Sequence, residues 1–272
     1  MKWRLNGHPA GGISPDDRGF SYGDGLFETI AVRAGTCRLF AAHVQRLASG
    51  AARLQLPPPD VEAVSRDTEA LIGSGQPDGV LKIIYTRGPG PRGYALPPVP
   101  QVTVAVGFAV GRQAAAGADG IAARTCRTPL GHNPVLAGMK TLNRLEQVLA
   151  RAEWSDAGIA EGLMFDTEGY LVCGTMSNVF LVRGGQLLTP LLDRCGVLGI
   201  MRGQVMEAAQ RLGIPVAEAR LNRASLQQAD EIFVTNSQIG IWPLGSLDGQ
   251  PCGPARLAGQ LRAELERAGI RE

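Results

Sequence analysis

The stretch AGMKTLNR, residues 137–144, contains the most informative residue of the chain, Lys140. Lysine is scarce, since the 272 residues include only Lys2, Lys82 and Lys140, and arginine supplies nearly all the other positive charge. Lys140 stands in an apolar loop directly before a predicted helix. Burial and nearby cations lower the pKa of a lysine and make its amine a nucleophile, so the stretch indicates Schiff-base chemistry. A solvated lysine at a helix start is the alternative interpretation.

The residues that follow Lys140 predict a region of mixed helices and strands. Leu142, Leu145, Leu149 and Ala152 recur at helical spacing and predict an amphipathic helix over 141–152. Apolar runs separated by glycine-containing turns then predict hairpins. The further strands are expected at 121–126, 162–166, 170–173, 177–182, 186–189, 231–235 and near Val216, and the further helices at 200–212, 225–228 and 254–268.

The residues before Lys140 predict a smaller region of the same kind. Its strands are expected at 26–32, 36–40, 80–86 and 101–110, and its helices at 41–54 and 60–72. We therefore predict a small N-terminal domain at 1–112, an Ala/Gly-rich linker at 113–120 and a larger C-terminal domain at 121–272. Because strands and helices do not alternate regularly, the pattern favours an α+β fold over a doubly wound sheet.

Composition excludes several classes of function. The formal net charge is +2 and no cluster of Lys and Arg stands out, so the chain lacks the basic surface that nucleic-acid binding needs. No uncharged stretch is long enough to span a bilayer, and the N-terminus does not resemble a signal peptide. The five cysteines form no CxxC and the three histidines are dispersed, so we expect free thiols, no metal site and a cytoplasmic location.

Several blocks, in this order, resemble the fold-type-IV pyridoxal-phosphate enzymes. They are DRGFSYGDGLFETI at 17–30, HVQRL at 43–47, KTLN at 140–143, CGTMSNVF at 173–180, GVLGIMR at 196–202 and FVTNS at 233–237. The resemblance covers nearly the whole chain. It implies two domains with pyridoxal 5′-phosphate between them, a small-molecule substrate and a homodimer.

Within that family, GDGLFETI, the loop from Arg87 to Tyr94 and KTLNRLEQVLAR most resemble the aminodeoxychorismate lyases. This implies conversion of 4-amino-4-deoxychorismate to 4-aminobenzoate and pyruvate, a step of folate biosynthesis. A D-amino-acid or branched-chain aminotransferase is the first alternative. A pyridoxal-phosphate-binding protein without catalysis is the second.

The resemblance also implies roles for individual residues. Lys140 would bind the cofactor covalently and then move protons, and Thr29 would assist the departure of enolpyruvate. Phe27, Arg87 and Arg92 would contact the substrate. The full cofactor-binding set would be Lys140, Arg46, Cys173, Ser177, Asn178, Ile200, Met201, Asn236 and Ser237. Without the resemblance, Arg46 is equally well a surface arginine, and Arg87 and Arg92 are ordinary loop residues.

Cys173 departs from the family pattern, which usually places Glu at this position, where the carboxylate keeps the pyridine nitrogen protonated. A neutral thiol is a weak donor and does not balance a pyridinium. We therefore expect weaker carbanion stabilisation, which a lyase that forms an aromatic product tolerates better than an aminotransferase does.

Overall fold

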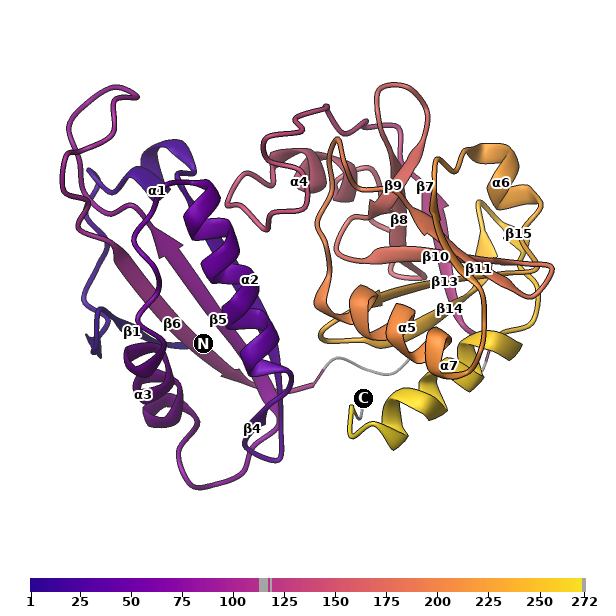
Figure 1. Ribbon diagram of the computed structural model, residues 1–272, viewed down its shortest axis with the longest axis horizontal. Helices are drawn as coiled ribbons and strands as arrows, with labels where there is room; N and C mark the ends of the chain where they lie inside the picture. Colours follow the sequence, from indigo (N-terminus) through magenta and orange to yellow (C-terminus); the bar gives the residue numbers. More distant parts are fainter. Residues whose placement is uncertain (113–116, 118, 271–272) are drawn as a thin grey trace. The chain divides into compact units, whose positions relative to one another are not determined.

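The computed structural model describes residues 1–112, 117 and 119–270, and the chain divides into two compact units. Unit 1 comprises Met1–Gln113 with Met139–Asn143, and unit 2 comprises Ala114–Gly138 and Arg144–Glu272. Each unit combines a sheet with helices, which agrees with the predicted α+β class (Figure 1). Most of the linker predicted at 113–120 lies outside the described residues.

Unit 1 is built on an antiparallel sheet with the strand order β2-β1-β6-β5-β3-β4. Its strands are β1 (Lys2–Leu5), β2 (His8–Pro9), β3 (Gly25–Arg33), β4 (Thr36–Cys37), β5 (Gly79–Thr86) and β6 (Thr103–Val110), and its helices are α1 (Arg18–Tyr22), α2 (Phe40–Arg53) and α3 (Val61–Ile72). β3, β5 and β6 pair along eight consecutive residues each. They form the most extensively paired part of the sheet.

Helix α2 packs on β3 through one apolar face. Val44, Leu47 and Ala51 on this face are buried, as the 3.6-residue periodicity of the sequence predicts. A Cβ at Gly50 would lie 2.9 Å from the Leu26 side chain, so glycine allows the helix to approach the strand closely. The close packing fixes the side chains of α2 against the strand that carries Phe27 and Thr29.

Unit 2 contains a larger mixed sheet with the order β12-β11-β10-β13-β14-β7-β8-β9, and β15 pairs with β14. Its strands are β7 (Ile121–Thr125), β8 (Ile159–Phe165), β9 (Leu171–Gly174), β10 (Asn178–Arg183), β11 (Gln186–Pro190), β12 (Val216–Ala219), β13 (Glu231–Asn236), β14 (Gly240–Leu247) and β15 (Gln250–Pro251). Its helices are α4 (Leu145–Arg151), α5 (Ile200–Arg211), α6 (Arg223–Gln227) and α7 (Arg256–Arg267).

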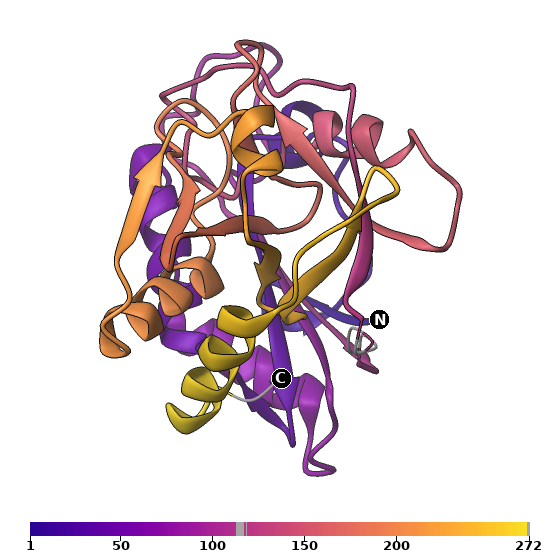
Figure 2. The same cartoon turned by 90° about the vertical axis from the view of Figure 1, so that its right-hand side faces the viewer.

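The strands of unit 2 enclose an apolar core that includes Leu163, Val179, Leu181 and Val234, each fully buried. Helices α5 and α7 lie side by side against this sheet (Figure 2). Across the described residues, no helix combines the length and the apolar character that crossing a membrane requires.

The helix predicted at 141–152 is wrong at its start, because α4 begins only at Leu145. The backbone of the preceding residues pairs with β3 instead: Leu142 N–H donates to Gly25 C=O at 3.0 Å, and Thr141 bridges Leu26. The apolar face predicted for this helix is also largely solvent-exposed, since Leu145 is 70% and Leu149 53% accessible.

Candidate active site

Lys140 lies in the extended segment Met139–Asn143, which belongs to unit 1 although it follows the first residues of unit 2 in sequence. Its carbonyl accepts a hydrogen bond from Phe27 N–H at 3.0 Å, so the segment extends the edge of the sheet beside β3. Asn143 Nδ2 donates to Gly23 C=O at 3.2 Å and closes the end of this pairing. Lys140 is therefore held by a paired backbone rather than by a loop.

The side chain of Lys140 lies over an aromatic ring. Its Nζ is 4.2 Å from the centroid of Phe27, and Nζ of Lys82 is 5.3 Å from the same ring. Cation–π attraction favours both positions. Thr29 pairs with Lys82 between β3 and β5, and side chains two residues apart share a face, so Phe27 and Thr29 lie on one side of the strand. The structure thus brings the predicted residues Lys140, Phe27 and Thr29 to one part of unit 1.

The opposite side of the same strand carries Glu28, which is 1% exposed and lies under α2. Its carboxylate accepts hydrogen bonds from Arg46 Nε at 2.8 Å, Arg46 Nη2 at 2.5 Å and His43 Nδ1 at 2.6 Å. Burial opposes ionisation of Glu28, but the bonds from His43 and Arg46 outweigh it and lower the pKa. Burial also lowers the pKa of His43, so its imidazole is neutral and donates from Nδ1.

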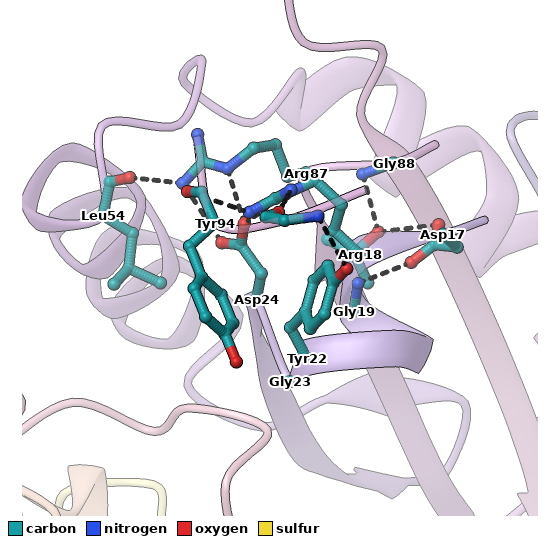
Figure 3. A network of polar contacts seen from close by, with 12 residues as sticks. Asp17, Arg18, Gly19, Tyr22, Gly23, Asp24, Leu54, Arg87, Gly88 and Tyr94 are labelled. Carbon is teal, nitrogen blue, oxygen red and sulfur yellow. Dashed lines mark hydrogen bonds and ion pairs between the residues drawn. The ribbon is translucent and has the colours of Figure 1, made fainter. Parts of the chain in front are cut away.

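Arg87 is held by a buried polar network (Figure 3). Its Nε and Nη2 donate to the two oxygens of Asp24, at 2.7 and 3.1 Å. Nη2 also donates to the Leu54 carbonyl at 2.7 Å, and Nη1 donates to the Gln55 carbonyl at 3.1 Å. Arg87 is 3% exposed. These bonds favour a structural role of Arg87 within unit 1 over a contact with a substrate carboxylate.

Arg18 joins the same network and organises the loop that carries Arg92. Its Nε donates to Asp24 Oδ2 at 3.0 Å and its Nη1 to Gly93 C=O at 2.9 Å. Burial raises the pKa of Asp24, but the two arginines outweigh this effect and the net shift is downward. Arg92 itself is exposed, and its neighbour Tyr94 packs edge-on against Tyr22 with ring centroids 5.6 Å apart.

In unit 2, the turn between β9 and β10 is organised by a buried carboxylate that the sequence analysis did not identify. Glu161 is fully buried and accepts bonds from Thr175 Oγ1 and Ser177 Oγ, both at 2.6 Å. Its position in β8, a strand that is otherwise apolar, is the signal that was available in the sequence. The hydroxyl of Ser177, a predicted cofactor contact, is therefore directed at Glu161.

Asn236 supports the same turn from β13. Its Nδ2 donates to Met176 C=O at 3.1 Å, while its Oδ1 accepts from the backbone of Gln238 at 2.7 Å and of Ile239 at 3.0 Å. Ser237, the next predicted residue, is half-buried in the turn that these bonds fix.

The start of α5 offers backbone donors. Gly199 is its N-cap, and no side chain caps the first turn, which contains Ile200 and Met201. Asn178 Nδ2 donates to Val197 C=O at 2.9 Å, and a Cβ at Gly199 would lie 2.0 Å from Asn178 Oδ1. Only glycine fits beside Asn178 here. Uncapped N–H groups at a helix start bind anions such as phosphate.

Cys173 is buried among apolar side chains that include Val172 and Met164. Burial is the main cause that raises the pKa of its thiol, and the negative charge of Glu161 adds to it. Cys173 is therefore a neutral thiol, as the sequence analysis expected.

Residues 25–247 match the model of the amino-transferase class IV family. An aminodeoxychorismate lyase of Vibrio harveyi is 35% identical over 91% of both chains. The crystal structure of 4-amino-4-deoxychorismate lyase from Pseudomonas aeruginosa is 46% identical, with a TM-score of 0.91 over 97% of this chain and 98% of that one.

A branched-chain aminotransferase of Thermoproteus uzoniensis is 25% identical, with a TM-score of 0.87 over 99% of this chain and 94% of that one. The fold class and the family resemblance predicted from the sequence are confirmed by these likenesses. The chain belongs to the amino-transferase class IV family.

Proposed function

We propose that the protein is a pyridoxal-phosphate-dependent lyase that converts 4-amino-4-deoxychorismate to 4-aminobenzoate and pyruvate. The observation that carries the proposal is the 46% identity and near-complete structural likeness to the Pseudomonas aeruginosa lyase, against 25% identity to the branched-chain aminotransferase. The amine of Lys140, held over Phe27, and the uncapped start of α5 are the chemical groups that a phosphate-bearing aldehyde needs.

The residues of each unit fit the cofactor in different ways. In unit 1, Lys140 would bind its aldehyde, and Arg46 would pair with its phosphate as a planar fork. In unit 2, the N–H groups of Ile200 and Met201 and the hydroxyl of Ser237 would bind the phosphate. Asn178 and Asn236 would keep the backbone of these phosphate-binding segments in place. Pyridoxal phosphate, when bound, supplies an electron sink for breaking a C–H bond beside the substrate nitrogen.

The side chains of unit 1 then perform the proton transfers. Once the substrate's amine takes the place of Lys140 on the aldehyde, the freed Lys140 amine would remove the proton from the ring carbon that bears the amine. The electron pair expels the enolpyruvyl oxygen on the neighbouring carbon, and the Thr29 hydroxyl or the Lys140 ammonium would donate a proton to that oxygen. The ring becomes aromatic, and the released enolpyruvate becomes pyruvate. Exposed Arg92 is the better candidate for a substrate carboxylate, because four of the five N–H groups of Arg87 donate to Asp24, Leu54 and Gln55.

We further propose that the enzyme works as a homodimer in the cytoplasm, as the family resemblance implies. The exposed apolar side chains Leu145, Val148 and Leu149 of α4 support an interface, because a cluster of this kind is usually covered in the working assembly.

The test is a paired assay of the purified protein with added pyridoxal phosphate. Release of 4-aminobenzoate from 4-amino-4-deoxychorismate, with little transfer of amino groups from D-alanine or leucine to 2-oxoglutarate, supports the lyase. Efficient amino-group transfer without 4-aminobenzoate would instead assign the protein to the aminotransferases.

A further inference from the structure

The Glu28 carboxylate accepts three hydrogen bonds from two side chains of α2, those of Arg46 and His43. Arg46 approaches it side-on, with Nε on one oxygen at 2.8 Å and Nη2 on the other at 2.5 Å. Such a bidentate pair fixes both the position and the plane of a guanidinium. His43, three residues before Arg46 on α2, bonds the Oε2 atom from its buried ring and keeps the carboxylate from rotating.

The place of Glu28 in the strand links this cluster to Lys140. Phe27 and Thr29 face the side on which Lys140 lies over the Phe27 ring, while Glu28 alone of the three faces α2. Since Phe27 N–H also bonds the Lys140 carbonyl, one short piece of β3 positions both Lys140 and Arg46. A shift of Glu28 would move Arg46 while the backbone pairing keeps Lys140 in place.

We propose that Glu28, supported by His43, is a positioning residue that holds the Arg46 guanidinium in place for the phosphate of the bound cofactor. The inference rests on the proposed function, because it assigns phosphate binding to Arg46. A long, flexible arginine loses side-chain entropy when it binds an anion, and a guanidinium already fixed by a carboxylate has lost most of it before binding. The Arg46 side chain is 15% exposed, whereas that of Glu28 is 1% exposed.

The test compares two ligands that differ only in the phosphate. Dissociation constants for pyridoxal phosphate and for pyridoxal are measured by absorbance and fluorescence titration of the apo protein. In Glu28→Gln, the dissociation constant for pyridoxal phosphate should rise about tenfold, because a charge-assisted pair is lost, while that for pyridoxal should change less than about twofold. Glu62→Gln, at an exposed carboxylate of α3, is the matched control and should change neither constant.

A double-mutant cycle adds a second readout. If Glu28 acts through Arg46, the phosphate-selective loss should appear in Arg46→Gln alone and should not grow further in Glu28→Gln/Arg46→Gln. Glu28→Asp keeps the charge but withdraws it by one methylene, and it should show the same selectivity should Glu28→Gln not fold.

Equal weakening of both ligands, unchanged binding of both, or additive losses in the cycle would each overturn the inference. The same experiments distinguish failure of this inference from failure of the proposed function. If the unmodified protein neither binds pyridoxal phosphate nor releases 4-aminobenzoate, the proposed lyase function and the role of Glu28 are both wrong. If it does both and Glu28→Gln shows no selectivity, only the role of Glu28 is wrong.

Discussion

Cys173 is a buried neutral thiol, and this chemistry limits what it can do for a bound cofactor. Burial and the charge of Glu161 raise its pKa, so it provides no negative charge to balance a pyridinium. We therefore expect Cys173→Ala to change the lyase kcat by less than about threefold, since only a small apolar contact is lost. The measurement is steady-state release of 4-aminobenzoate. A strong rise of turnover in folded Cys173→Glu would show that the missing carboxylate limits the reaction.

Asp24 is the acid-sensitive centre of the buried network in Figure 3. Its pKa in the folded protein lies below its ordinary value of 3.8, because the bonds from Arg87 and Arg18 outweigh the effect of burial. The ionised Asp24 carboxylate therefore contributes fully to the free energy of unfolding above about pH 3.8. This contribution is lost as the pH falls through the lower pKa that Asp24 has in the folded protein. At neutral pH we expect Asp24→Asn to lose about 3 kcal/mol, because two buried arginines lose their shared partner.

Urea unfolding of the unmodified protein and of Asp24→Asn between pH 7 and pH 3 measures this effect. The difference in the free energy of unfolding should be largest at neutral pH and should shrink in the acid range. A difference that does not change with pH would show that the Asp24 carboxylate is not the titrating group.

Individual residues differed in how well the sequence predicted them. Lys140 stood out because lysine is rare in this chain, and the structure places it over Phe27. Glu161 was missed, although a carboxylate inside an apolar strand has to find donors when it is buried. The ion pair between Arg87 and Asp24 was not predicted, because sequence spacing does not show that the Asp24 carboxylate lies within reach of the Arg87 guanidinium.

Among the secondary-structure elements, the segment around Lys140 shows that apolar periodicity alone does not predict where a helix begins. Apolar spacing predicted a helix from 141, but the backbone of Lys140 and Leu142 pairs with β3 and leaves only Leu145–Arg151 helical. Helix propensity depends on neighbouring residues, so it cannot predict pairing with a strand more than one hundred residues away in sequence. The helices α2 and α5, whose apolar faces pack on a sheet of their own unit, were predicted to within about two residues at each end.

The loop after β5 depends on a single glycine. Gly88 has φ +80°, and a Cβ there would lie 1.6 Å from the Gln101 carbonyl oxygen. We expect Gly88→Ala to destabilise unit 1 by more than about 2 kcal/mol and to displace the loop that carries Arg92. Thermal unfolding and the KM for 4-amino-4-deoxychorismate are the measurements.

The matched control is Gly203→Ala, at the fourth residue of α5, where a Cβ meets no atom within 4 Å. This change should stabilise the helix by up to about 1 kcal/mol. The interpretation of Gly88 is contradicted if both substitutions have the same effect on unfolding.

For the whole molecule, the order of the sequence blocks was more informative than any single element. The blocks predicted the family and the α+β fold, and the match to the family model extends across residues 25–247. The grouping of Met139–Asn143 with unit 1 could not be predicted, because it depends on backbone pairing with β3 and not on composition.

The exposed apolar residues of α4 lead to a prediction on assembly. Light scattering at micromolar concentration should give a mass twice the 28.7 kDa of one chain. Leu145→Asp combined with Leu149→Asp should shift the protein towards the monomer, because both substitutions place charge on an apolar surface. A monomer in the unmodified protein would contradict the homodimer.

The most direct test of the central claim is to trap the cofactor on the chain and map its position. The protein is incubated with pyridoxal phosphate, reduced with borohydride and digested, and the peptides that contain Lys2, Lys82 and Lys140 are weighed by mass spectrometry. We predict that the pyridoxyl group is on Lys140 alone and that the reduced protein no longer releases 4-aminobenzoate, whereas the untreated protein does. A label on Lys82 or Lys2, or no label at any lysine, would contradict the account.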